Sequence, residues 1–126
     1  MKMNDKYVHL SVMHTLLSLY DMKDLAKSVT KAICKDHGDI VELQTMKNSG
    51  FILRRKKDGT ITDKEISKIM ADVIKELMDD KIDEVLDYIS ENYEFAYDSS
   101  AIGEEFIKEI FDISRTGRLI YIEIDI

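Results

Sequence analysis

The spacing of apolar residues predicts two helices at the start of the chain. From Tyr7 to Tyr20, apolar side chains recur every three or four residues, which is typical of one buried helix face. A second helix with the same period follows Asp21, a good N-cap residue, and Gly38 suits the position just after its end. We therefore expect two amphipathic helices joined by a short turn.

The pattern changes from helical to alternating after the second helix. Apolar and polar residues alternate from Val41 to Thr45, which is typical of a half-buried strand. A tight turn at 47–50 and a second apolar run from Phe51 then predict a β-hairpin across residues 40–56.

The segment after the hairpin predicts a well-capped helix with an interruption. Thr62 and Glu65 have the spacing of a capping box, and apolar residues then follow a helical period as far as Leu77. The next apolar stripe is rotated by roughly 130° from the first, because each helical residue turns the chain by about 100°. A straight helix cannot bury both stripes on one core, so we expect a break or kink near Met78–Lys81.

Two further elements are expected toward the end of the chain. A last helix opens at Ser99 or Ser100, and Arg115 and Gly117 suit its final turn and its end. Residues 119–126 then alternate isoleucine with polar side chains, which is the clearest strand pattern in the chain. This strand fits either the edge or the centre of a sheet.

Together these elements predict one α+β domain over residues 1–126. About five helices pack on a small antiparallel sheet, which is formed by hairpin 40–56 and the C-terminal strand 119–126. The length of 126 residues suits one ordinary domain, and no apolar run approaches the ~20 residues of a membrane helix. A single cysteine, Cys34, and the lack of a signal-peptide pattern predict a soluble cytoplasmic protein.

Charge divides the chain into a basic half and an acidic half. The formal net charge is −7, but residues 1–60 hold 11 Lys and Arg against 7 Asp and Glu, whereas residues 61–126 hold 7 against 18. Such a split indicates surfaces with different partners, or one copy's half pairing with the other half of a second copy. A homodimer is therefore one of the partner arrangements that the sequence leaves open.

Acidic residues on the predicted helices form the first candidate site. Five of them follow spacings of four, four, three and four, and three more lie on the predicted last helix. Like charges at such spacings destabilise a helix by roughly 0.2–0.5 kcal/mol per pair, so a surface that keeps them suits a basic partner. The candidate partner-binding residues are Glu76, Asp80, Glu84, Asp87, Glu91, Glu105, Glu109 and Asp112.

Basic residues on the second helix and the hairpin form an alternative site. Lysines recur every four residues along the helix, and a basic run closes the hairpin, where it would contact phosphates as the wing of a winged-helix protein does. The net acidity of the chain argues against stable DNA binding. The alternative nucleic-acid-binding residues are Lys23, Lys27, Lys31, Lys35, Lys47, Arg54, Arg55, Lys56 and Lys57.

No sequence motif indicates catalysis or metal binding. The histidines His9, His14 and His37 belong to no recognisable motif, and the chain has no phosphate-binding glycine loop or nucleophile elbow. Cys34 stands three residues before His37, but structural zinc needs a second such pair. Stretch 58–65 matches only the second half of a calcium loop, because basic residues occupy the earlier ligand positions. We expect no enzymatic activity, cofactor or metal.

The sequence therefore favours a small acidic interaction protein without catalytic activity. Its most concrete form is an inhibitor or immunity-type protein that binds a basic surface of a nucleic-acid-handling protein. The alternative is a winged-helix-like DNA-binding regulator that uses the lysine face and the hairpin. No membrane partner is expected.

Overall fold

Two β-hairpins form one antiparallel sheet, and the described helices pack on one face and at one end of it. The computed structural model describes residues 5–37, 41–47, 49–56, 61–81, 83–84 and 102–124. The elements in chain order are α1 (Asp5–Leu19), α2 (Met22–His37), β1 (Val41–Lys47), β2 (Gly50–Arg55), α3 (Asp63–Asp80), α5 (Glu104–Ile110), β3 (Phe111–Thr116) and β4 (Leu119–Ile124). The predicted α+β class is confirmed.

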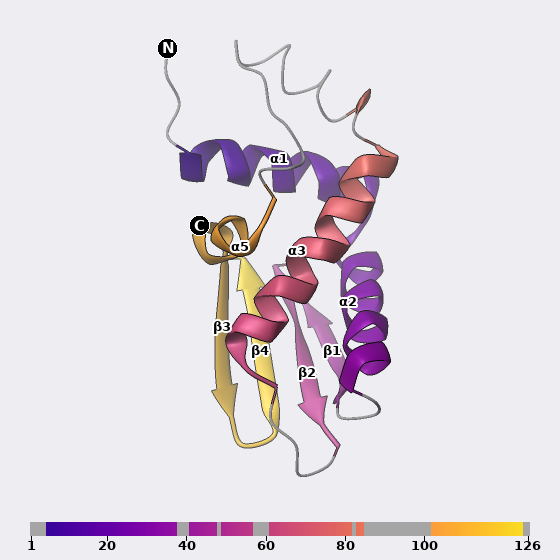
Figure 1. The fold of residues 1–126 in the computed structure, drawn as a ribbon, viewed down its shortest axis with the longest axis vertical. Coiled ribbons are helices and arrows are strands. Elements are labelled where there is room, and N and C mark those ends of the chain that lie inside the picture. The colour runs from indigo at the N-terminus through magenta and orange to yellow at the C-terminus, as the bar shows by residue number, and fades with distance from the viewer. Residues whose placement is uncertain are drawn as a thin grey trace.

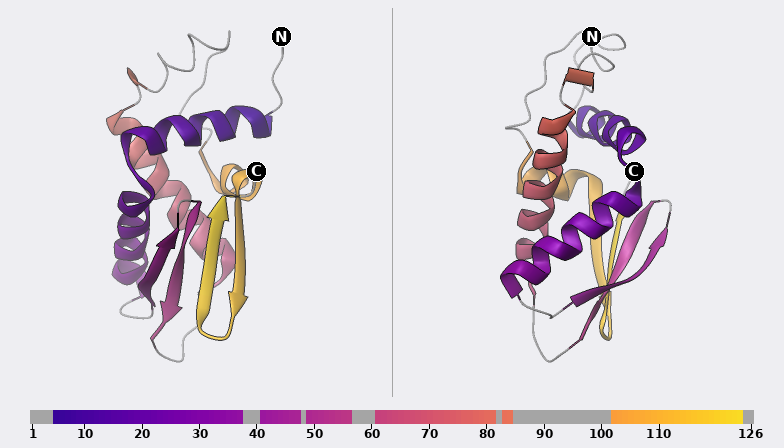
Figure 2. Two further views of the ribbon diagram at one scale, coloured as in Figure 1. Left: turned by 180° about the vertical axis from the view of Figure 1, so that it is seen from behind. Right: turned by 90° about the vertical axis from the view of Figure 1, so that its right-hand side faces the viewer.

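The helices gather on one face and at one end of the sheet. Helix α3 crosses the sheet, α2 packs against α3 and β1, and α1 and α5 lie together at the end of the sheet where β3 begins (Figure 1). Seen from behind, the opposite face of the sheet carries no described helix (Figure 2). In the described parts of the chain, no helix is both long and apolar enough to span a bilayer.

The strand order is β1-β2-β4-β3, and all neighbouring pairs are antiparallel. The predicted hairpin 40–56 is confirmed as β1 and β2, with a bulge between Leu43 and Thr45. The predicted strand 119–126 is confirmed over the described residues as β4. It lies inside the sheet between β2 and β3, so the alternative of a C-terminal edge strand is wrong.

The core lies between α3 and the covered face of the sheet. Phe51 and Leu53 of β2 and Ile120 and Ile122 of β4 point to this face and are almost wholly buried. They join the apolar stripe of α3 and the inner faces of α1, α2 and α5 in one cluster. Burial of each such side chain is worth roughly 1.5–3 kcal/mol.

Helix α3 begins and ends as the sequence predicts. The Thr62 hydroxyl accepts a hydrogen bond from the Glu65 amide at 3.1 Å, which is half of the predicted capping box. The helix ends at Asp80, and the Lys81 amide closes it on the carbonyl of Met78. The expected break near Met78–Lys81 is therefore confirmed, whereas the apolar residues of the second stripe, from Ile82 to Ile89, all lie outside the described residues.

The predicted last helix is too long. Helix α5 ends at Ile110, and residues 111–116 form β3, so neither Arg115 nor Gly117 ends a helix. Gly117 has φ +59° and is the first of two residues between β3 and β4, as in a type II′ hairpin turn. The apolar positions in residues 110–113 fit both a helical and an alternating period. This segment forms a strand because it pairs with β4.

Candidate functional site

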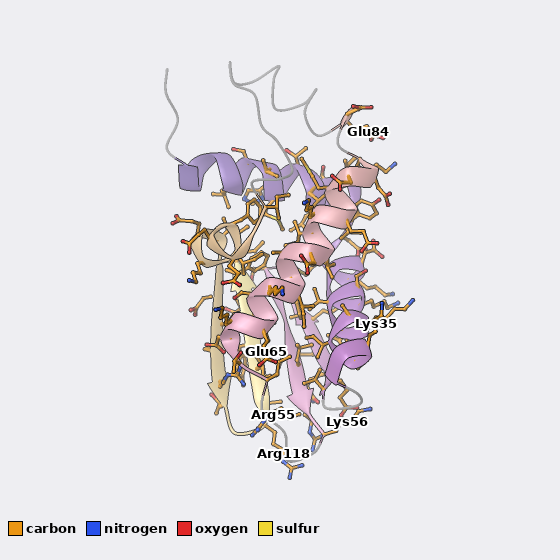
Figure 3. All side chains as sticks on the ribbon, viewed as in Figure 1. Lys35, Arg55, Lys56, Glu65, Glu84 and Arg118 are labelled. Carbon is orange, nitrogen blue, oxygen red and sulfur yellow. The ribbon has the colours of Figure 1, made fainter. Side chains whose placement is uncertain are left out.

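The predicted acidic residues divide into two groups. Glu76 and Asp80 lie on the last two turns of α3, and Glu84 lies just beyond its end (Figure 3). With their exposed neighbours, they form a surface that we call the acidic corner: Glu76, Asp79, Asp80, Asp83 and Glu84. The remaining predicted acids, Asp87 and Glu91, lie outside the described residues.

The acidic corner works against the dipole of the helix that carries it. The last turn of α3 contains Asp79 and Asp80 and no basic residue. A helix C-terminus carries partial negative charge, so each acid there costs roughly 0.3–1 kcal/mol at low ionic strength. Because α3 ends at Asp80, Glu84 does not continue the helical line of Glu76 and Asp80, and the described charge is concentrated at the helix end.

Two polar contacts organise the acidic corner. The Tyr20 hydroxyl, just after α1, donates to Asp80 Oδ2 at 3.3 Å and links the ends of α1 and α3. Desolvation, and then the charge and hydrogen bond of Asp80, raise the pKa of Tyr20 above its ordinary value of 10.0. Lys81 Nζ lies 3.4 Å from Glu84 Oε1, but both side chains are exposed, so this pair contributes little.

An exposed apolar side chain lies next to Tyr20. Leu19, the last residue of α1, keeps 38% of its surface accessible and is one of two large apolar residues that are exposed in the described chain. Asp80, Lys81 and Glu84 lie close enough to Tyr20 to act on its hydroxyl. An aromatic residue near charged groups, beside an exposed aliphatic residue, has the composition of a protein interface, where apolar anchors lie inside a polar rim. The helical period placed Tyr20 on the buried face of α1, and Tyr20 does pack partly against the core. The exposure of Leu19 and the contact of Tyr20 with Asp80 were not predicted from the sequence.

The second acidic group lies around the start of β3. We call Glu105, Glu109 and Asp112 the acidic edge; all three are exposed. Asp112 lies on β3 and not on a helix as predicted, because α5 ends two residues before it. Its direct cross-strand partner is Glu123 of β4, an arrangement in which like charges face each other.

The lysines of the alternative site lie on the outer face of α2. All four are exposed, while the opposite face of α2 packs on β1 and α3; the four are Lys23, Lys27, Lys31 and Lys35. The hairpin differs from the free wing of a winged helix, because β2 pairs along its length with β4. Lys57 and the side chain of Lys47 lie outside the described residues.

The other predicted basic residues, Arg54, Arg55 and Lys56, lie near an arginine that was not predicted from the sequence to belong to this site. Arg118, in the β3–β4 turn, lies at the same end of the sheet as Arg55 and Lys56 (Figure 3). The Arg118 carbonyl accepts the Arg55 amide at 2.9 Å, and Lys56 Nζ lies 3.8 Å from the Glu42 carboxylate. We call Arg54, Arg55, Lys56 and Arg118 the basic end. The neighbouring Arg115 is instead bound to Asp63 of α3, at 2.7 and 3.0 Å.

A shallow groove separates the start of α3 from α5 and β3. Its volume is about 390 Å³, its apolar floor is formed by Ile107, Phe111 and Ile113, and Lys64 and Glu104 lie at its rim. Within the described ranges, no three His, Cys, Asp or Glu side chains are placed to hold a metal. The Cys34 thiol donates to the Val41 carbonyl at 3.3 Å, a contact that ties the end of α2 to β1.

Comparison of the chain with known proteins identifies no family to which it belongs. No protein-family model matches the chain, and neither the curated proteins nor the solved structures contain a significant match.

Proposed function

We propose that this chain is an interaction protein without catalytic activity, which binds a basic surface of a nucleic-acid-handling protein through the acidic corner. An inhibitor or immunity-type protein is the most concrete form of this proposal. The observation that carries it is the concentration of carboxylates at the C-terminal end of α3, where the helix dipole disfavours them. A cytoplasmic location, which the single Cys34 suggests, belongs to the same proposal.

The acidic corner acts by occupying groups that would otherwise bind phosphates. Carboxylates accept charge-assisted hydrogen bonds from lysine and arginine, as phosphate oxygens do. The collected negative charge accelerates the encounter with a basic surface, and Leu19 and Tyr20 supply apolar contact once the surfaces meet. Binding of this kind competes with nucleic acid and weakens as salt rises.

The test removes charge from one acidic group at a time. The variant E76Q/D80N/E84Q neutralises the acidic corner and keeps an amide oxygen at position 80 to accept the Tyr20 hydroxyl. The variant E105Q/E109Q/D112N removes the same number of charges from the acidic edge and serves as the matched control. Both are used as baits at low salt in nuclease-treated lysate of the native host.

The expected result is that the wild type and the acidic-edge variant retain the same basic or nucleic-acid-handling protein. The acidic-corner variant should lose at least roughly 100-fold in affinity, because several charge-assisted contacts disappear together. An acidic-corner variant that retains this partner as strongly as the wild type does would overturn the proposal.

The basic end favours a second candidate, a DNA-binding regulator. Arg118 joins the three hairpin bases at one end of the sheet, and the lysine face of α2 is exposed. Changing Arg54, Arg55, Lys56 and Lys57 to alanine should weaken binding about equally on all DNA sequences and flatten its salt dependence. DNA binding that the quadruple variant leaves unaltered excludes this candidate.

A further inference from the structure

The two edges of the sheet differ in how well they are protected against pairing. The edge strand β1 contains a bulge between Leu43 and Thr45, a device that disfavours the addition of another strand. The other edge strand, β3, pairs with β4 in unbroken register over all six residues. It contains no proline, lysine or bulge, and no other described strand lies beside it.

The hydrogen bonds of β4 reveal which groups of β3 face outward. Backbone groups point alternately to the two sides of an antiparallel strand. The Ile124 amide donates to the Ser49 carbonyl at 2.7 Å, and the Arg118 carbonyl accepts the Arg55 amide. The even-numbered residues of β4 therefore face β2, and the odd-numbered residues face β3.

The outward groups of β3 follow from its register with β4. The odd-numbered residues of β4 pair with Asp112, Ser114 and Thr116, so these residues point inward. Phe111, Ile113 and Arg115 alternate with them and direct their backbone groups to the open edge. The Phe111 amide donates to the Ile107 carbonyl at the end of α5. The backbone groups that remain for a partner strand are the Phe111 carbonyl and the amides and carbonyls of Ile113 and Arg115.

The charge along this edge changes from acidic near the start of β3 to basic near its end. Glu105 and Glu109 lie on α5, which leads directly into β3, and Asp112 is the second residue of β3, whereas the far end of β3 leads into the turn with Arg118. An antiparallel second copy of β3 places the acidic start of each strand against the basic end of the other, twice by symmetry. A parallel copy places acid against acid.

We propose that two copies of this chain associate through antiparallel pairing of their β3 strands, which doubles the sheet. Ile113 then lies opposite Ile113 of the partner subunit, and both exchange backbone hydrogen bonds. Each Arg115 amide donates to the carbonyl of Phe111 of the partner subunit. The grooves floored by Ile107, Phe111 and Ile113 adjoin at the twofold axis, and Arg118 approaches α5 of the partner subunit. The pairing uses none of the acidic corner and is independent of the proposed function.

The test is sedimentation equilibrium of the full chain at about 10–300 µM protein and about 0.15 M salt. Because an interface at one strand edge is small, we expect a dimer of twice 14.6 kDa with a Kd of roughly 10–100 µM. A mass of 14.6 kDa at every concentration overturns the proposal. A monomer that instead takes up an unrelated extended peptide on β3 overturns it too.

Charge reversal tests the orientation of the two strands. E105K/E109K and R118E should each weaken the dimer roughly tenfold, because every broken contact occurs twice, and combining them should restore it. E76K/E84K changes the same number of charges in the acidic corner and should not weaken the dimer. Weakening by E76K/E84K to the same extent, or failure of the combined variant to recover, contradicts the proposed pairing.

A backbone substitution tests the strand pairing itself. Ile113→Pro removes an amide that faces away from β4, so the β3–β4 ladder keeps its bonds while the proposed intermolecular bonds are lost. A folded Ile113→Pro chain should be monomeric, and a dimer as strong as the wild type would contradict the pairing. Where this variant does not fold, the charge-reversal series decides.

Discussion

The acids at the C-terminal end of α3 and those at the start of α5 carry the same kind of charge in opposite electrostatic settings. Glu104 and Glu105 stand in the first turn of α5, where a helix favours negative charge, whereas Asp79 and Asp80 stand in the last turn of α3, where it does not. Acids at the start of a helix are explained by the stability of that helix. Acids at its end need another explanation, which is why we assign partner binding to the acidic corner.

The largest effect is expected from breaking the sheet that supports the acidic edge. A Cβ atom at Gly50 would lie 2.1 Å from the Ile122 carbonyl oxygen and 2.8 Å from Glu123 Cα, and both are backbone atoms. Gly50→Ala should therefore lower the free energy of unfolding by roughly 3 kcal/mol, measured by urea denaturation. Gly103→Ala is the matched control, because a Cβ there meets nothing within 4 Å. Equal losses for both would refute the steric explanation.

A smaller loss is expected at the end of α3 that lies away from the acidic corner. Thr62→Ala removes the hydroxyl that accepts the Glu65 amide and should cost about 1 kcal/mol of unfolding free energy. Thr62→Ser keeps the acceptor and should recover most of this loss in the same urea titrations. A Thr62→Ser variant as unstable as Thr62→Ala would show that the methyl group matters more than the cap.

Neutralising the acids near the end of α3 and those in the first turn of α5 should change stability in opposite directions. E76Q/D80N relieves the repulsion at the C-terminal end of α3 and should raise the unfolding free energy by roughly 0.5–1 kcal/mol at low salt. E104Q/E105Q removes favourable charges from the first turn of α5 and should lower it by a similar amount. Both changes should shrink at high salt, where charges are screened. The same sign for both variants would contradict the dipole explanation.

The smallest effect is a shift in one tyrosine titration. The pKa of Tyr20 is raised, so the neutral hydroxyl is the form that folding favours, and its contribution is present below pH 10.0 and lost as pH rises through the folded pKa. Asp80→Ala should return this pKa toward the ordinary value, because the charge and the acceptor both disappear. Ultraviolet titration against Tyr20→Phe isolates the signal; no difference between wild type and Asp80→Ala would exclude this link.

Local patterns were sufficient to predict much of the fold. The helical period of the apolar residues predicted α1 and α2, and the alternation of apolar and polar residues predicted the first hairpin and β4. The spacing of Thr62 and Glu65 predicted the start of α3. The rotation between two apolar stripes predicted where α3 ends. Each of these predictions depends on residues that are close in sequence, where periodicity and capping carry the information.

The missed features depend on contacts that are distant in sequence. The positions of Phe111 and Ile113 fit a helical period, and only their hydrogen-bonded pairing with β4 makes this segment a strand. Gly117 likewise suits the end of a helix as well as a hairpin turn. The meeting of Arg118 with Arg55 follows only from the strand order. The acidic residues were recognised from sequence, but their separation into two surfaces required the end of α3 and the position of β3.

The most direct test measures stability and partner capture together on E76Q/D80N/E84Q. If the acidic corner is kept for binding at the expense of stability, this variant should unfold at higher urea than the wild type and no longer retain the partner. E105Q/E109Q/D112N should retain the partner as the wild type does. An acidic-corner variant that still captures the partner as the wild type does would contradict the account.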